Sequence, residues 1–165
     1  ILTMRQVPQP IVAAVRGHAV GAGFAFAAAA DLRFAAPDAR FGAPFLTLGV
    51  TGGDLGLSWF LPRLIGAGRA AEVLYSAATL DAADAERYGL VSRVVADPVA
   101  EALTVAERLA AFPPYGVTVT KQLLDASPGA GLREHLDSEA RAQVLGLLTE
   151  ASRAAVADTN RRSSA

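Results

Sequence analysis

Cysteine is absent from the chain, which excludes a disulfide framework and a thiolate metal site. The two histidines, His18 and His135, are too far apart in sequence to form a helical pair of metal ligands. We therefore expect no metal centre. Because cysteine-free chains suit reducing compartments, we also expect a cytoplasmic location.

An excess of charge of one sign is absent as well. The 15 basic and 16 acidic residues give a formal net charge of -1, so we expect neither a nucleic acid nor an anionic membrane as partner. The longest uninterrupted apolar run, Phe24 to Ala30, is too short to cross a bilayer. The chain begins at Ile1 without an initiator methionine or the basic-then-apolar order of a signal peptide, so we expect a fragment or a processed form.

Apolar residues, by contrast, are abundant. They make up 52% of the 165 residues, against 19% for charged residues, which argues for one globular core. The β-branched run between Pro10 and Gly17 predicts a buried strand, and the alanine-rich segment 24–30 predicts a helix buried on all sides. Segments 32–35 and 40–42 predict two more strands, and this order predicts an α/β fold.

The rest of the chain is predicted to be mainly helical. We expect a glycine-rich loop at 49–56, a strand at 90–95 and helices at 57–65, 67–77, 81–88, 99–111, 115–126 and 132–157. Pro62 is expected to kink or interrupt the first of these helices. Asp81 is expected to cap the third.

The segment Gly17–Gly23 is the most informative motif. Its small residues lead a strand into the start of a helix, where main-chain N–H groups have no partner inside the helix. Such amides, together with the helix dipole, attract a phosphate, a carboxylate or the oxyanion of an enolised carbonyl. Close packing of the helix on the strand would also require glycine, so the motif by itself leaves both interpretations open.

Asp54 is the second candidate, because it lies in a glycine-rich loop among apolar residues. Burial there would disfavour the charged carboxylate and suit it to act as a general acid or base. As an exposed N-cap of the following helix, it would have a purely structural role. The local pattern by itself favours the cap.

The order of six segments carries further information: Pro10–Gly23, Ala30–Ala35, Phe41–Pro44, Leu61–Gly66, Asp84–Val95 and Thr120–Lys121. Together they resemble the enoyl-CoA hydratase/isomerase (crotonase) superfamily, over about residues 5 to 155. The resemblance implies an α/β spiral of strand–strand–helix units in 1–97 and a helical C-terminal region for trimerisation in 98–165. It also implies a homotrimer or a hexamer.

The resemblance further implies a substrate and a mechanism. Family members act on acyl-CoA thioesters in fatty acid metabolism, with coenzyme A as part of the substrate and no other cofactor. Two main-chain N–H groups hold the thioester oxygen while an enolate forms. Ala22 would supply one of these amides, and Gly21 and Gly23 would let the backbone approach the ligand. The other amide lies in a family segment upstream of the position of Ile1.

Two positions depart from the family pattern. Hydratases of the family carry glutamates where this chain has Ala25 and Phe45, so hydration by a glutamate pair is not expected. Asp54 stands where dienoyl-CoA isomerases and a subset of hydratase-like proteins carry an aspartate, which favours it as the acid/base. Without the glutamate pair, isomerisation is favoured over hydration. The residues that we expect to contact substrate are Gly21, Gly23, Ala25, Phe45, Leu46, Leu57 and Trp59.

The same departures leave other classes of protein open. Without the two glutamates, the chain would also suit a non-catalytic acyl-CoA-binding protein or an assembly subunit. A third interpretation is a truncated piece whose partly uncovered apolar helix drives self-association.

Overall fold

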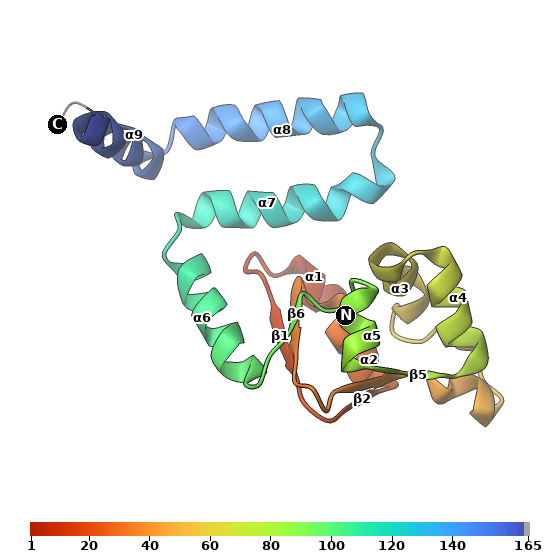
Figure 1. The fold of residues 1–165 in the computed structure, drawn as a ribbon. Helices are drawn as coiled ribbons and strands as arrows, with labels where there is room; N and C mark the ends of the chain where they lie inside the picture. Colours follow the sequence, from red (N-terminus) through yellow and green to blue (C-terminus); the bar gives the residue numbers. More distant parts are fainter. Residues whose placement is uncertain (164–165) are drawn as a thin grey trace. The chain divides into compact units, whose positions relative to one another are not determined.

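The computed structural model describes residues 1–163 (Figure 1). Contacts divide the chain into two compact units, unit 1 from Ile1 to Arg108 and unit 2 from Leu109 to Ala165. The predicted division at 97/98 assigns the helix that begins at Pro98 to the C-terminal region, whereas nearly all of that helix belongs to unit 1. The two units are described separately below.

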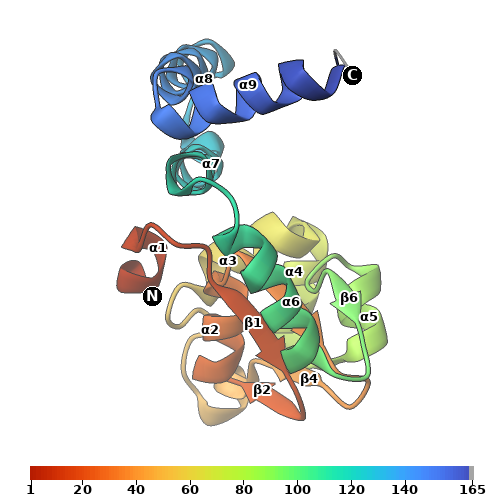
Figure 2. The same ribbon diagram turned by 90° about the vertical axis from the view of Figure 1, so that its left-hand side faces the viewer.

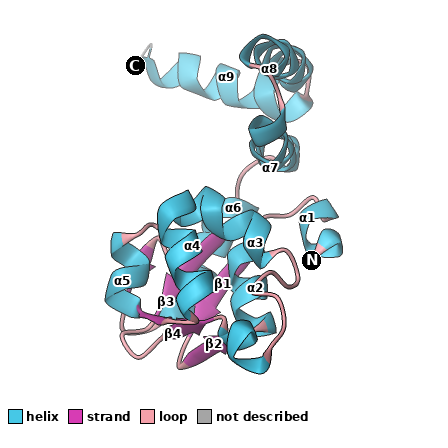
Figure 3. Ribbon diagram, turned by 90° about the vertical axis from the view of Figure 1, so that its right-hand side faces the viewer, coloured by secondary structure: helices cyan, strands magenta, loops and turns pink. Residues whose placement is uncertain are grey.

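Unit 1 contains two three-stranded sheets. The first has the order β1-β3-β6 and is parallel throughout, with β1 (Val12–Val15), β3 (Leu32–Ala35) and β6 (Arg93–Val94). The second has the order β2-β4-β5, with β2 (His18–Val20) parallel to β4 (Arg40–Gly42) and β5 (Thr79–Asp81) antiparallel to β4. Helices of unit 1 surround these strands (Figure 3).

The chain passes from the first sheet to the second twice, once from β1 to β2 before a helix and once from β3 to β4 before the next helices. This order confirms the expected strand–strand–helix units. Gly17, with a φ of 59°, makes the first passage, and its carbonyl accepts a hydrogen bond from Arg40 N at 2.7 Å. The predictions for 32–35 and 40–42 are confirmed, whereas β2 and β5 were not predicted as strands.

The helices of unit 1 are α1 (Leu2–Gln6), α2 (Ala22–Ala29), the 3-10 helix η1 (Pro44–Leu48), α3 (Leu57–Ile65), α4 (Ala67–Ser76), α5 (Ala82–Arg87) and α6 (Pro98–Ala110). Pro62 lies inside α3, which runs through it as one helix, so the proline does not interrupt it. Asp81 caps α5 as predicted, because its Oδ1 accepts a hydrogen bond from Asp84 N at 2.8 Å.

Helix α2 supplies much of the core of unit 1. Its buried residues are Phe24, Ala25, Ala27, Ala28 and Ala29. The ring of Phe24 packs against that of Phe41 with centroids 5.6 Å apart. The prediction of burial on all sides is nevertheless wrong for one face, because Ala22 is exposed and Phe26, one turn further on, is 49% exposed. Residues four apart lie on the same side of a helix, so α2 has one open face.

Unit 2 consists of α7 (Pro114–Ala126), the 3-10 helix η2 (Ser127–Gly129), α8 (Leu132–Leu147) and α9 (Glu150–Ser163). The views in Figures 1 and 2 show α7 and α8 running side by side. The single predicted helix 132–157 is two helices, because Thr149 Oγ1 accepts a hydrogen bond from Ser152 N at 3.2 Å and starts a new helix. Over residues 1–163, no helix is both long and apolar enough to cross a membrane.

Candidate active site

The turn before α2 continues the pairing of β2 with β4. Val20 is opposite Gly42 in the register, and Gly21 N–H donates to the Gly42 carbonyl oxygen at 2.9 Å. Gly21 then has φ 58° and ψ -117°, a backbone conformation that is unfavourable for residues other than glycine. The main chain therefore leaves the sheet and enters the helix within one residue.

The next three amides form the candidate site. Ala25 N–H donates to the Gly21 carbonyl at 3.0 Å, whereas the N–H groups of Ala22, Gly23 and Phe24 have no hydrogen-bond acceptor in the described part of the chain. Phe24 is buried, and Ala22 and Gly23 are exposed. Free donors thus lie at an accessible helix N-terminus, which is the arrangement that binds an anionic oxygen.

The glycines of this turn are not explained by close packing. A Cβ atom at Gly21 would meet nothing nearer than the Phe45 ring at 3.6 Å, and one at Gly23 would meet nothing within 4 Å. Gly21 is instead required by its positive φ. The packing interpretation that the sequence left open is therefore wrong for both positions.

Two arginines neutralise the opposite end of α2. Arg33 Nη1 donates to the Ala30 carbonyl at 2.5 Å, and Arg5 Nη1 donates to the Ala29 carbonyl at 2.7 Å. These guanidinium groups face the negative end of the helix dipole together with the Asp31 carboxylate, which pairs with Arg5 at 2.9 Å. The positive end has no charged cap among the described residues, so the dipole there favours an anion at Ala22.

Ala25 and Phe45, the two positions where hydratases of the family carry glutamates, differ in burial. Phe45 is half-buried, with its ring beside Gly21. Ala25 is 0% exposed and belongs to the core, as does Leu57. The expectation that Ala25 and Leu57 contact substrate is therefore corrected: both are core residues, buried where α2 packs against α3.

Asp54 is exposed and does not sit in an apolar pocket. Its Oδ1 accepts a hydrogen bond from Leu55 N at 2.8 Å, and its carbonyl accepts one from Leu57 N at 2.8 Å. The alternative role as N-cap is also wrong, because Gly56 is the N-cap of α3 and no side chain caps that helix. Asp54 thus presents an accessible carboxylate on a loop held by main-chain bonds.

Trp59 and Leu46 remain partly open. Trp59 is 48% exposed, with the Arg63 guanidinium 3.8 Å from its ring centroid; Leu46 is 40% exposed. Unit 1 also exposes large apolar side chains that sequence reasoning missed: Val20, Phe26, Leu48, Val50 and Leu55. In the structure β2 buries Ala19 between two exposed neighbours, but three residues are too few for this alternation to be recognised in the sequence.

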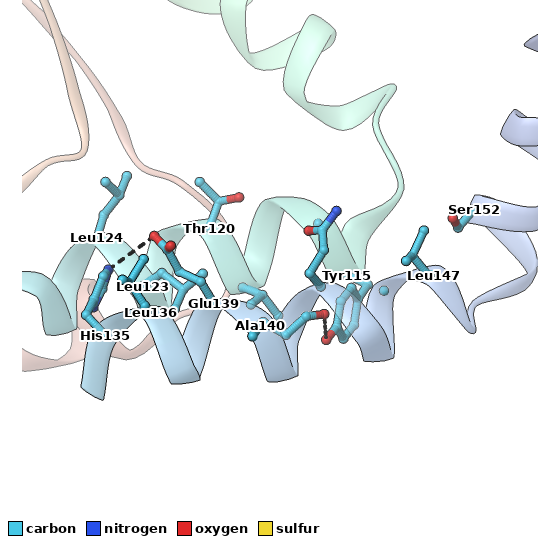
Figure 4. Close-up of a pocket in the computed structure, with 15 residues that line it drawn as sticks. Tyr115, Thr120, Leu123, Leu124, His135, Leu136, Glu139, Ala140, Leu147 and Ser152 are labelled. Carbon is cyan, nitrogen blue, oxygen red and sulfur yellow. Dashed lines mark hydrogen bonds and ion pairs between the residues drawn. The ribbon is translucent and has the colours of Figure 1, made fainter. Parts of the chain in front are cut away.

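A separate groove lies in unit 2 between α7 and α8, with a volume of about 730 Å³. Tyr115 Oη donates to the Ala142 carbonyl at 2.9 Å along it, and His135 Nε2 lies 3.5 Å from Glu139 Oε1 (Figure 4). Its lining contains none of the predicted site residues. It therefore adds nothing to the candidate site at Ala22.

The α/β core presents, among the described residues, main-chain donors without an acceptor at the start of an apolar helix, an arrangement that suits an anionic oxygen. Comparison with known proteins gives the family. The model of the enoyl-CoA hydratase/isomerase family matches residues 1–155, and the chain belongs to this family, with the crotonase fold.

Several relatives are similar over most of the chain. A probable enoyl-CoA hydratase of Mycobacterium tuberculosis, EchA12, is 40% identical over 147 residues, which cover 87% of this chain and 52% of the relative. A probable enoyl-CoA hydratase of Rhizobium meliloti is 38% identical over 135 residues, covering 81% of this chain and 52% of the relative. The chain thus spans about half the length of these curated relatives.

Solved structures agree with the sequence relatives. A putative enoyl-CoA hydratase from Streptomyces coelicolor A3(2) superposes with a TM-score of 0.94 at 36% identity, over 98% of this chain and 59% of that one. A probable enoyl-CoA hydratase/isomerase from Mycobacterium abscessus superposes with a TM-score of 0.91 at 38% identity, over 98% of this chain and 63% of that one.

Proposed function

We propose that the chain carries part of the active site of an enzyme that acts on an acyl-CoA thioester and stabilises an enolate at the Ala22 amide. The observation that carries the proposal is the set of free N–H groups at the start of α2 in a member of this family. An enolate bears its negative charge on the former thioester oxygen, which a fixed N–H donor stabilises more than it stabilises the neutral carbonyl.

Asp54 is the proposed proton-transfer group, and the proposed reaction is movement of a double bond. The Asp54 carboxylate takes a proton from the carbon next to the thioester carbonyl, and the electron pair moves onto the carbonyl oxygen. When the enolate collapses, the same proton returns to a carbon further along the conjugated chain, so the carboxylate is regenerated and the substrate keeps its atoms. An exposed carboxylate with one oxygen that accepts no hydrogen bond from the described part of the chain suits both steps.

Isomerisation is preferred over hydration because hydratases of the family add water with a pair of glutamates, whereas one carboxylate is enough to move a proton between two carbons. At the two positions where hydratases of the family carry glutamates, this chain has the buried Ala25 and the half-buried Phe45. An aromatic ring beside Gly21 also makes the turn apolar. We assign the remaining substrate contacts to Gly21, Gly23, Phe45, Leu46 and Trp59.

The proposed enzyme uses coenzyme A only as part of its substrate and acts in the cytoplasm, in lyase or isomerase steps of fatty acid metabolism. The absence of cysteine supports the location. The names of the relatives, which are enoyl-CoA hydratases, support the acyl-CoA substrate.

Assembly as a homotrimer or hexamer is proposed from the surface of unit 2. Its helices leave large apolar side chains about half or more exposed, among them Leu124, Leu132, Leu136, Val144, Leu145, Leu147 and Leu148. Exposed apolar surface of this extent is typical of a protein–protein contact. A symmetric assembly of copies would cover it.

A substitution that deletes one N–H group tests the oxyanion donor. Ala22→Pro removes the amide hydrogen at the first position of a helix, where proline is tolerated. Ala67→Pro is the matched control, because Ala67 also follows a glycine N-cap at the start of a helix. In the longest natural polypeptide that contains this sequence, turnover of a 3-enoyl-CoA should fall about 100-fold in Ala22→Pro and stay near the parent value in Ala67→Pro. Equal turnover in the two variants would refute the assignment.

A binding protein without catalysis is the second candidate, favoured by the absence of both glutamates. Asp54→Asn separates the two candidates. The enzyme loses turnover of 3-enoyl-CoA and dienoyl-CoA substrates in this variant, whereas the binding protein shows calorimetric binding of acyl-CoA and no turnover before or after the change.

A further inference from the structure

The loop 51–56, which contains Asp54, leads into α3. In this loop Gly53 packs closely against Ser58 of α3. Gly53 does not have a positive φ, so a left-handed backbone is not the reason for glycine here. A Cβ atom there would nevertheless lie 2.6 Å from Ser58 Oγ and 2.9 Å from Ser58 Cβ. Glycine is therefore needed for space, because the main chain one residue before Asp54 rests directly on the first turn of α3.

Asp54 is held on its other side by the residues that follow it. Leu55 N–H donates to Asp54 Oδ1 at 2.8 Å, and Leu55 has a φ of 47°, a left-handed conformation that disfavours a branched side chain. The other carboxylate oxygen, Oδ2, accepts no hydrogen bond from the described residues. One oxygen anchors the side chain, and the other is left for a ligand.

We propose that the packing of Gly53 on Ser58 sets the position of the Asp54 carboxylate, with Ser58 acting as a positioning residue for proton transfer. The inference rests on the proposed function, in which Asp54 moves the proton. Proton transfer requires heavy atoms within about 3 Å of each other, and a misplacement of about 1 Å can cost about 100-fold in rate. A contact one residue away from Asp54 is close enough to control this distance.

Adding one methyl group at the contact tests the proposal. In Gly53→Ala the new Cβ cannot remain at 2.9 Å from Ser58 Cβ, so the loop moves and takes Asp54 with it. We expect kcat for a 3-enoyl-CoA to fall about tenfold or more, with KM within about twofold, because substrate is held by other residues.

Removing the side chain on the other side of the contact tests whether activity can be rescued. Ser58→Gly in the Gly53→Ala background removes the Ser58 Cβ and makes room for the alanine, so kcat should recover about fivefold or more. Ser58→Ala in the same background removes only Oγ and leaves the clash with Cβ, so it should not recover. Gly68→Ala is the control for a glycine change, because a Cβ there meets nothing within 4 Å.

The experiment uses the longest natural polypeptide that contains this sequence, with thermal unfolding to confirm that each variant folds. Crystal structures of Gly53→Ala and of Gly53→Ala/Ser58→Gly should show the Asp54 carboxylate displaced in the first and returned in the second. If Asp54 stays in place in Gly53→Ala, or the rescue fails, the positioning proposal is wrong. If Asp54→Asn turns over like the parent, the proposed function fails, and the two crystal structures still decide whether Ser58 positions Asp54.

Discussion

The guanidinium of Arg33 lies against the main-chain oxygen of Leu90, with an Nε to oxygen distance of 2.6 Å. Arg33 is 7% exposed, and its Nη1 also donates to the Ala30 carbonyl at the end of α2. One buried cation therefore joins β3, the end of α2 and the segment after α5. Burial lowers the pKa of Arg33 to about 10, which leaves it charged at neutral pH.

Arg33→Lys should lower the free energy of unfolding by about 2 kcal/mol, because a single ammonium does not reproduce the planar fork that serves Leu90 and Ala30 together. Urea unfolding measures the change. The exposed Arg108→Lys is the control and should stay within about 0.5 kcal/mol of the parent. Equal stability of the two variants would show that the fork is not needed.

Asp97 gives a prediction about acid stability. Its pKa lies below the ordinary value, first because Ala100 N–H donates to it and then because Arg16 pairs with it. A lowered pKa means that the ionised form stabilises the folded state. This stabilisation is fully present above about pH 4 and is lost as pH falls through the lowered pKa.

Asp97→Ala should therefore be less stable than the parent at pH 7, and the difference should shrink as the pH falls below about 4. Asp97→Asn keeps an acceptor oxygen for α6 without a titrating charge, so it should keep part of the stability at every pH. Thermal unfolding across the pH range measures both. A constant gap between Asp97→Ala and the parent down to low pH contradicts this account.

The cap of α5 can be tested by itself. Asp81→Ala removes the acceptor of the Asp84 N–H bond and should cost about 1 kcal/mol of unfolding free energy. Asp81→Asn keeps a side-chain oxygen at the same place, and we expect it to lose only a few tenths of a kcal/mol. Chemical denaturation compares the three proteins, and an equal loss in both variants would exclude the cap as the cause.

The proposed assembly predicts an effect of charge on unit 2. Leu145 is 57% exposed and Leu148 is 60% exposed. A variant with glutamate at either position should therefore fold, but it would place a charge in the subunit contact. Sedimentation of Leu145→Glu and Leu148→Glu should show smaller species than the parent. Gln122→Glu, an exposed site on α7, adds the same charge and should leave the assembly intact if the apolar residues make the contact.

The short strands show where sequence reasoning succeeds. The segments 32–35 and 40–42 are confirmed as β3 and β4, because the turn residues 37–39 separate two short segments that each contain a phenylalanine, Phe34 and Phe41. The three-residue strands β2 and β5 are too short for a period of two to be visible. The break between α8 and α9 was missed because Thr149 looks like any polar helix residue until its Oγ1 caps Ser152 N.

Some features of the candidate site could likewise be predicted from the sequence, and others could not. The free amides were predicted from the small residues around Ala22, because the end of any helix leaves its first N–H groups unbonded. The burial of Ala25 and Leu57 and the exposure of Asp54 depend on which face each helix or loop turns to the core. Such facing is decided by contacts between distant segments, and a helix such as α2 with almost uniform hydropathy gives no indication of it.

The bond from Gly21 N–H to the Gly42 carbonyl ties the location of the Ala22 donor to the alignment of two strands. Substitutions along α2 can therefore accumulate without moving the Ala22 N–H group. Loss of a single residue from β4 would instead shift its anchor by about 3.3 Å, the rise of one strand residue. Within this lineage, length in the β2 and β4 segments should vary far less than residue identity.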